Sequence, residues 1–270
     1  MHGGPHEHGD RGRRRPTSHG ARDEARRRGR SSRLPRGPHR HETPRHRLLP
    51  DHRSDRLSVP FQTPALCIIT DERQSPERTA VVVERACAGA AARSILVQLR
   101  HRRLATRELQ RLAEWLRRIT SDHGARLILN DRVDVALATS ADGVHLPAAG
   151  MNVDAARKLL GPDLMLGRSV HSIDEIRALA DAPLDYLQYG PIYATPSKAA
   201  YGAPHGEERF KEAIGASGAR PLVAVGGINA ERAARLRALG AAGVAVIGAV
   251  TGAGDPATAA NNLLSALEQN

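Results

Sequence analysis

From residue 65 onward, short apolar runs alternate with segments of helical character, and this alternation limits the possible folds more than any other feature. Between the runs lie Ala-, Leu- and Arg-rich segments with apolar residues at helical spacing, most clearly in 107–118, 154–160, 173–180, 230–239 and 256–267. Eight runs have the composition of buried parallel strands: ALCIIT (65–70), SILVQL (94–99), RLILN (126–130), GVHL (143–146), LMLGRS (164–169), YLQYG (186–190), PLVAVGG (221–227) and GVAVIG (243–248).

This strand–helix unit, repeated eight times in residues 65–268, predicts an α/β protein of the (β/α)8 TIM-barrel type. The alternative is an open, doubly wound sheet. We favour the barrel because the units number eight and no Gly-x-Gly-x-x-Gly follows the first run.

The first 60 residues have a different composition. They contain 16 arginines, no lysine and seven acidic residues, whereas the remaining 210 residues carry 24 basic and 22 acidic residues. With few large apolar side chains, this segment cannot bury enough surface to offset its chain entropy. We therefore expect a disordered basic tail at 1–60 and a barrel domain at 61–270. Alternatively, a non-Met start codon near Leu57 or Val59 would make the tail an artefact of the assigned gene start.

Composition also restricts the partners. Aromatic residues make up 3% of the chain, so the tail offers charge without stacking groups, and we expect no specific nucleic-acid binding. No apolar run is long enough for a membrane span, and two cysteines without a pairing pattern indicate a reducing compartment. We expect a cytoplasmic protein, and whether it forms a homo-oligomer stays open.

The residues that follow each predicted strand are polar or glycine. In a (β/α)8 barrel these positions converge on one face, where the chemistry takes place. They are Thr70 and Asp71, Arg100, Asn130 and Asp131, His145, Ser169 with His171, the 190–198 loop, Gly226-Gly227, and Gly248 after Ile247. Glycines after the last two strands are typical of a phosphate site on backbone amides, although each is also explained by a tight turn. The pattern predicts a binding site for a small phosphorylated molecule.

The loop GPIYATPSK (190–198) gathers two hydroxyls and one ammonium group within four residues, namely Thr195, Ser197 and Lys198. Gly-Pro marks it as a loop entered directly from a strand. A polar surface turn is the simpler explanation. At the mouth of a barrel, the same residues are suited to an anion-binding lid, which is our prediction.

Taken together, several stretches resemble the thiamine phosphate synthase/TenI superfamily of barrels. They occur in family order: VQLR (97–100), LILNDRVDVALATSADGVHL (127–146), GRSVHS (167–172), GPIYATPSK (190–198), VAVGGIN (223–229) and AGVAVIGAV (242–250). The resemblance implies a thiazole phosphate ligand and one of two activities. The synthase joins an aminopyrimidine pyrophosphate to the thiazole phosphate and expels pyrophosphate with Mg²⁺. The TenI-type tautomerase shifts a proton in a thiazole carboxylate phosphate and needs no cofactor.

The residues match the synthase only in part. Its Gln-x-Arg-x-Lys pattern reads Gln98, Arg100 and Arg102 here, so arginine replaces lysine. Asp131 corresponds to one magnesium ligand of the synthase, although it is equally suited to capping the next helix. Gly150 stands where the synthase has its second magnesium carboxylate. Because Mg²⁺ prefers several oxygen ligands, this loss argues against the synthase without excluding it.

Other residues resemble the tautomerase branch, notably His-Leu-Pro at 145–147 and the GRSVHS stretch. Imidazole gives and takes protons near neutral pH, so His171 is our candidate acid–base catalyst, with Arg100 holding an anionic group. We first favour a TenI-type tautomerase, with the synthase as alternative and a non-catalytic thiazole-phosphate-binding barrel as second alternative. The predicted substrate-binding residues are Gln98, Asn130, His145, Ser169, Thr195, Ser197, Lys198, Gly226, Gly227, Ile247 and Gly248.

Overall fold

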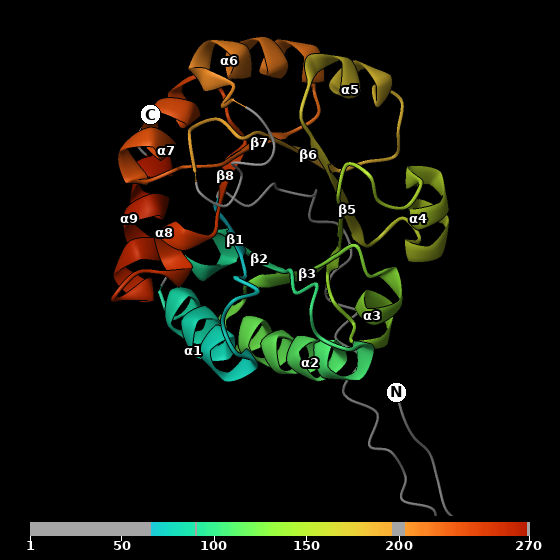
Figure 1. Ribbon diagram of the computed structural model, residues 1–270, viewed down its shortest axis with the longest axis vertical. Helices are drawn as coiled ribbons and strands as arrows, with labels where there is room; N and C mark the ends of the chain where they lie inside the picture. The colour runs from blue at the N-terminus through green and yellow to red at the C-terminus, as the bar shows by residue number, and fades with distance from the viewer. Residues whose placement is uncertain (1–65, 90, 196–202, 269–270) are drawn as a thin grey trace, which may run out of the picture. The chain divides into compact units, whose positions relative to one another are not determined.

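The computed structural model of the chain describes residues 66–89, 91–195 and 203–268. Its eight strands are parallel and close into a barrel in chain order, with the last strand paired to the first (Figure 1). The (β/α)8 prediction is therefore confirmed, whereas the predicted tail at 1–60 lies outside the described residues. The strands are β1 (Leu66–Ile69), β2 (Ile95–Leu99), β3 (Arg126–Asn130), β4 (Gly143–Leu146), β5 (Met165–Val170), β6 (Tyr186–Tyr189), β7 (Leu222–Val225) and β8 (Gly243–Val246).

Helices follow the strands and surround the barrel (Figure 1). Several begin at a side chain that accepts a hydrogen bond from the first turn, as Ser75, Asn152, Ser172 and Asn229 do. They are α1 (Pro76–Cys87), α2 (Thr106–His123), α3 (Val133–Ala138), α4 (Val153–Leu160), α5 (Ile173–Ala178), α6 (Gly206–Ser217), α7 (Ala230–Ala238), α8 (Gly248–Thr251) and α9 (Pro256–Glu268), with a 3-10 turn at Ala92–Ser94.

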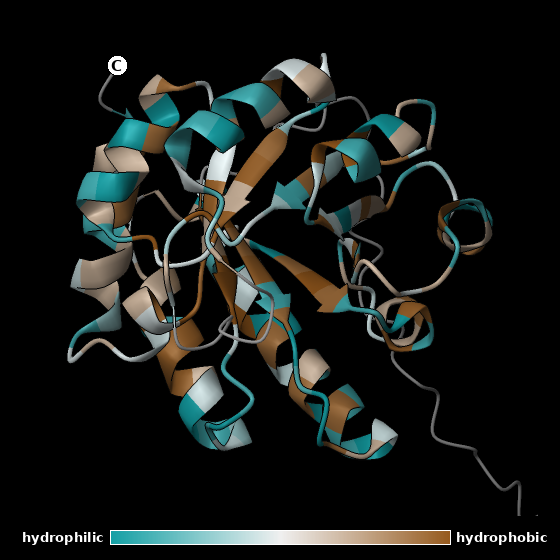
Figure 2. Cartoon of the chain, turned by 45° about the horizontal axis from the view of Figure 1, so that its top comes forward, coloured by the Kyte–Doolittle hydropathy of each residue, from teal (hydrophilic) through white to brown (hydrophobic). Residues whose placement is uncertain are grey.

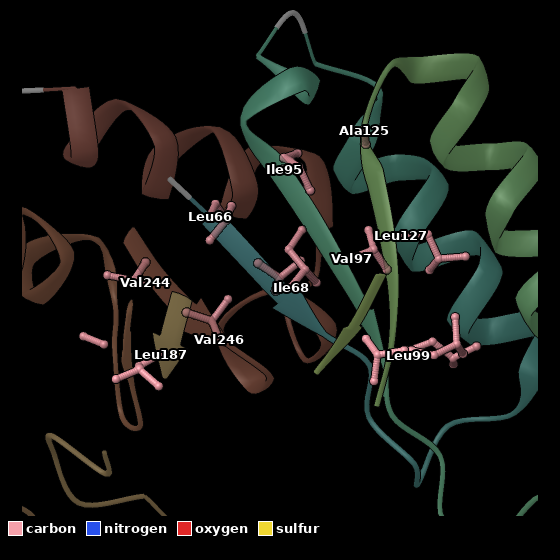
Figure 3. Packing of buried hydrophobic residues seen from close by; sticks show 14 of the residues in the cluster. Leu66, Ile68, Ile95, Val97, Leu99, Ala125, Leu127, Leu187, Val244 and Val246 are labelled. Atoms are coloured by element: carbon pink, nitrogen blue, oxygen red, sulfur yellow. The ribbon is translucent and has the colours of Figure 1, made fainter. Parts of the chain in front are cut away.

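Alternate residues of each strand face opposite sides of the barrel wall, which creates two apolar layers. The outer layer fills the space between strands and helices and includes Leu66, Ile68, Val97 and Leu127 (Figure 3). The hydropathy colouring shows the same division, with apolar strands surrounded by helices that carry polar outer faces (Figure 2). Within the described ranges, no helix is long and apolar enough to cross a membrane.

The inner layer is apolar only in part. Nine buried side chains fill the barrel interior: Cys67, Ile69, Leu96, Ile128, Met165, Tyr186, Val223, Val225 and Ala245. Closer to the carboxyl ends of the strands, the interior positions become polar, and Gln98, His145 and Gln188 are each 1–2% exposed. Buried polar groups need hydrogen-bond partners, so these side chains must pair with one another or with a bound molecule.

Candidate active site

A chain of side-chain amides crosses the barrel interior below the mouth. Gln188 Nε2 donates to Gln98 Oε1 at 3.0 Å, and Gln98 Nε2 donates to Asn130 Oδ1 at 3.0 Å. The Cys67 thiol also donates to Gln98 Oε1, and burial raises the pKa of this thiol to about 12, so it stays protonated. Since the Oδ1 atom of Asn130 already accepts from below, its amide N–H groups are the donors that remain for a ligand.

A second interior cluster joins three strands. His145 Nδ1 lies 2.9 Å from the Tyr186 hydroxyl, and His145 Nε2 lies 2.8 Å from Ser169 Oγ. Both ring nitrogens of this buried histidine are thus engaged inside the protein. His145, predicted to contact substrate, is 1% exposed in the barrel interior and lies beside Ser169, whose half-buried hydroxyl is at the β5 exit.

Cationic residues and their partners occupy the exits of β1 and β2. The Arg100 backbone N–H donates to Thr70 Oγ1 at 2.9 Å, and this hydroxyl donates back to the Arg100 carbonyl at 3.1 Å. The Arg100 guanidinium lies 3.6 Å from Glu72, and Arg102 forms two short hydrogen bonds to the same carboxylate. The Arg102 guanidinium holds the pKa of Glu72 down at about 2, so the carboxylate is ionised near neutral pH.

Asp131 and Gly150 lie side by side. Asp131 follows β3 in a left-handed conformation (φ 62°), and its N–H donates to the His145 carbonyl. A methyl group built on Gly150 would be 2.9 Å from Asp131 Oδ1 and 2.8 Å from Pro147 Cδ. The structure therefore has no room for a larger side chain at 150 unless this loop shifts. Arg168 fixes the loop by donating to the carbonyls of Ala148 and Met151.

His171 lies just beyond β5 and is half-buried. Its Nδ1 atom is 2.6 Å from the carbonyl oxygen of Gly190, and its backbone N–H donates to Glu175 Oε2. Because a carbonyl can only accept, Nδ1 must carry the proton, which leaves Nε2 as the basic nitrogen of the neutral ring. The predicted acid–base group thus has a defined tautomer.

The start of the 190–198 loop packs on the exit of β7. The Ile192 and Tyr193 N–H groups donate to the carbonyls of Val225 and Gly226 at 2.9 and 3.1 Å. Gly226 and Gly227 have φ values of 105° and 65°, and a methyl group on Gly227 would lie 2.7 Å from the Ala194 carbonyl oxygen. Only glycine meets both requirements at this turn.

The guanidinium group of Arg232 packs against the outer side of this turn. The Arg232 guanidinium lies 4.4 Å from the centre of the Tyr193 ring and donates to the Gly227 carbonyl. The Tyr193 hydroxyl donates to Glu207 on α6 at 2.6 Å. Thr195 is half-buried at the end of the described part of the loop, and the predicted lid residues Ser197 and Lys198 lie outside the described residues.

The last strand exit is open. Ile247 precedes α8 and packs on the inner apolar layer, whereas Gly248, the first residue of α8, is exposed with nothing within 4 Å of a built methyl group. Gly226-Gly227 and Gly248 follow neighbouring strands, so the structure brings the two predicted phosphate-binding turns together. Within residues 66–89, 91–195 and 203–268, no group of three or more His, Cys, Asp or Glu side chains is arranged to hold a metal ion.

Three functional candidates were missed from the sequence, namely Gln188, Tyr186 and Glu72. Tyr186 and Gln188 alternate along one buried strand run, and a glutamine in such a run requires polar partners, which was the available signal. Glu72 follows the exit pair Thr70-Asp71 by one residue. Nothing local indicates that it contacts arginines about thirty residues later.

A closed parallel barrel with arginines, an imidazole and glycine turns at its strand exits defines the class of (β/α)8-barrel enzymes. Known proteins identify the family. The model of the family described as thiamine monophosphate synthase matches residues 66–250. The chain belongs to this family, whose enzymes act in thiamine biosynthesis.

Individual relatives agree with this assignment. The thiamine-phosphate synthase of Chlorobium luteolum is 45% identical over 203 residues, covering 75% of this chain and 92% of that protein. The bifunctional protein ThiM/ThiE of Symbiobacterium thermophilum is 45% identical over 169 residues, which are 63% of this chain and 35% of that longer protein. The structure of thiamine phosphate pyrophosphorylase from Pyrococcus furiosus has a TM-score of 0.68 at 34% identity and covers 77% of this chain and 97% of its own.

Proposed function

We propose that the chain is a thiamine-phosphate synthase, a transferase that joins the aminopyrimidine group of a pyrophosphate ester to thiazole phosphate and releases pyrophosphate. The observation that carries this proposal is the 45% identity over 92% of a relative named for that activity. The comparisons thus favour the synthase, which was the alternative prediction from the sequence, over the tautomerase, which was the first prediction. The arrangement of charges at the mouth supports the same choice.

In this proposal the two ends of the mouth have separate tasks. The turns at Gly226-Gly227 and Gly248 bind the phosphate of the thiazole through backbone amides. Arg100 faces the diphosphate of the other substrate, because a guanidinium binds phosphate oxygens bidentately. Asn130, oriented by Gln98, donates to an acceptor atom between them. Ser169, supported by His145, supplies a hydroxyl on the opposite wall.

The residues present fit a magnesium ion bound by a single protein carboxylate. Asp131 is exposed at the mouth, and Mg²⁺ often takes one or two carboxylates together with substrate phosphate oxygens and water. Gly150 beside it adds no ligand. When bound, the ion supplies positive charge that stabilises the departing pyrophosphate.

The test is direct measurement of thiamine phosphate formation from both substrates with magnesium. We expect one pyrophosphate released per thiamine phosphate formed. Arg100→Gln is expected to lower turnover by about 10²-fold, a typical effect of removing one charge-stabilising group. Arg209→Gln is the matched control, because Arg209 pairs with Glu212 on the outer helix α6 and should leave turnover unchanged. Absence of coupling by the unmodified protein would contradict the proposal.

The tautomerase is a second candidate because of the geometry of His171. Its Nδ1–H is fixed on the Gly190 carbonyl, so Nε2 is the ring nitrogen that would take a proton from a bound thiazole in this reaction. If this is the activity, the thiazole carboxylate phosphate isomerises without metal, and His171→Ala lowers that rate by about 10²–10⁴-fold. The same purified sample, assayed for both reactions, decides between the two candidates.

A further inference from the structure

The exits of β1 and β2 carry five charged side chains that are paired with one another. Asp71 accepts three hydrogen bonds from the side chain of Arg73, at 2.6–3.1 Å. Glu72 accepts from Arg102 Nε at 3.0 Å and from Arg102 Nη2 at 2.6 Å. Glu72 Oε2 also lies 3.6 Å from Arg100 Nη1. Two carboxylates therefore oppose three guanidinium groups, which leaves one net positive charge.

The two contacts of Glu72 differ in strength. Arg102 donates two hydrogen bonds from its side chain and a third from its backbone N–H at 3.3 Å, so the side-chain contact is bidentate and the backbone reinforces it. The contact with Arg100 is a single, longer approach. The Glu72 side chain is 12% exposed, the Arg100 side chain 26% and the Arg102 side chain 64%. An anion entering the mouth can thus take Arg100 from Glu72 more readily than it can take Arg102.

Arg100 and Arg102 occupy the two cationic positions of the Gln-x-Arg-x-Lys pattern, and Glu72 places a negative charge against both. We propose that Glu72 is a specificity-determining residue, an internal counter-ion that reduces the anionic charge this part of the mouth accepts and that competes with bound diphosphate for Arg100. The identity of the ligand as a diphosphate rests on the proposed function. The electrostatic effect of Glu72 depends only on the geometry.

Two consequences follow from this arrangement. A multiply charged anion is repelled by Glu72 more than a singly charged one, so Glu72 moderates the affinity for pyrophosphate more than that for orthophosphate. As pyrophosphate departs, Glu72 regains Arg100, which favours product release. A purely structural role, in which Glu72 only holds the loop at 100–102 in place, predicts the opposite sign. Its removal would then loosen the loop and weaken anion binding.

The experiment is calorimetric titration of the full-length chain with inorganic pyrophosphate in the presence of a chelator. Glu72→Gln keeps the size of the side chain and removes the charge. Coulomb's law for one unit charge facing a multiply charged anion near the protein surface, weakened by solvent and salt, gives an expected gain in pyrophosphate affinity of about tenfold. Orthophosphate affinity should rise less. The matched control Glu212→Gln neutralises an ion-paired glutamate on α6 and should change neither affinity.

A double variant makes the same comparison without leaving the Arg102 guanidinium unpaired. Arg102→Met combined with Glu72→Gln removes both partners, so neither is left uncompensated. Under the proposal the double variant binds pyrophosphate more tightly than Arg102→Met alone. This comparison also serves if Glu72→Gln alone does not fold. Unchanged or weaker binding after loss of the Glu72 charge, in either comparison, overturns the proposal.

Failure of the counter-ion proposal can be distinguished from failure of the proposed synthase activity. If the unmodified protein forms thiamine phosphate but Glu72→Gln binds pyrophosphate no more tightly, the counter-ion role is wrong and the synthase activity stands. If the unmodified protein forms none and Glu72→Gln binds more tightly, the activity is wrong and the counter-ion role stands. If no variant binds pyrophosphate, the counter-ion role is wrong.

Discussion

Gln188→Met should destabilise the protein measurably although it preserves the length of the side chain. Gln188 is 2% exposed and donates to Gln98 Oε1 at 3.0 Å and to Cys67 Sγ at 3.6 Å. Methionine donates to neither. One net hydrogen bond of about 1 kcal/mol is lost, and the buried Oε1 atom of Gln98 keeps only the weak thiol donor, a further penalty of about 1–2 kcal/mol. We therefore expect the free energy of unfolding to fall by about 2–3 kcal/mol.

Urea unfolding followed by circular dichroism measures this change. Leu187→Met is the control, because Leu187 is the buried neighbour on the outer face of the same strand, and a swap of similar volume there should cost less than about 1.5 kcal/mol. The pair Gln98→Met and Gln188→Met should also be less than additive, since they share one hydrogen bond. A loss for Gln188→Met no larger than that of the control would refute the reasoning.

Three further predictions concern the mouth, acid stability and the tail. Gly227→Ala should lower stability by about 1–3 kcal/mol and weaken thiazole phosphate binding, because φ is 65° and the new methyl group would lie 2.7 Å from a carbonyl oxygen; unfolding and titration measure both effects. The pKa of Glu72 is lowered from 4.5 to about 2, so its contribution to stability is present above pH 4.5 and is lost as the pH falls towards 2. Urea unfolding over this pH range should therefore show a smaller fall in the free energy of unfolding for Glu72→Gln than for the unmodified protein. Deletion of residues 1–60 should leave melting temperature and turnover unchanged, and a clear loss of either would mean that the segment contributes to the barrel.

The sequence by itself determined the fold and the face of the barrel on which the candidate site residues gather. Apolar runs of strand length, repeated eight times with helical segments between them, leave few architectures other than a closed parallel barrel. The strand from Arg126 to Asn130 and that from Gly143 to Leu146 agree with prediction residue for residue. Helix ends were less well predicted: α2 continues to His123, five residues beyond expectation, and α5 stops at Ala178, two residues short of it. Helical periodicity fades gradually at such ends, and tertiary packing decides the last turn.

Strand order also explains why candidate residues were found at the strand exits. Parallel strands in one barrel all end at the same face, so residues such as Arg100, Ser169 and Gly227 could be assigned to one mouth without knowledge of any contact. Their distances, partners and burial could not. For His145 the rule of position gave the strand exit, but not its burial in the interior or the contacts of its two ring nitrogens with Tyr186 and Ser169.

Only the tertiary structure decided which side chains act on which. Gln98 meets Gln188 across 90 residues of sequence, and Glu72 meets Arg102 across 30. These contacts depend on how neighbouring strands are aligned around the barrel and on whether each side chain points inward or outward. The spacing of the residues along the chain predicts neither contact. The contact between Gly150 and Asp131 is of the same kind. Local pattern fixes what each element is, whereas closure of the barrel fixes which polar groups share its interior and therefore what the site can bind.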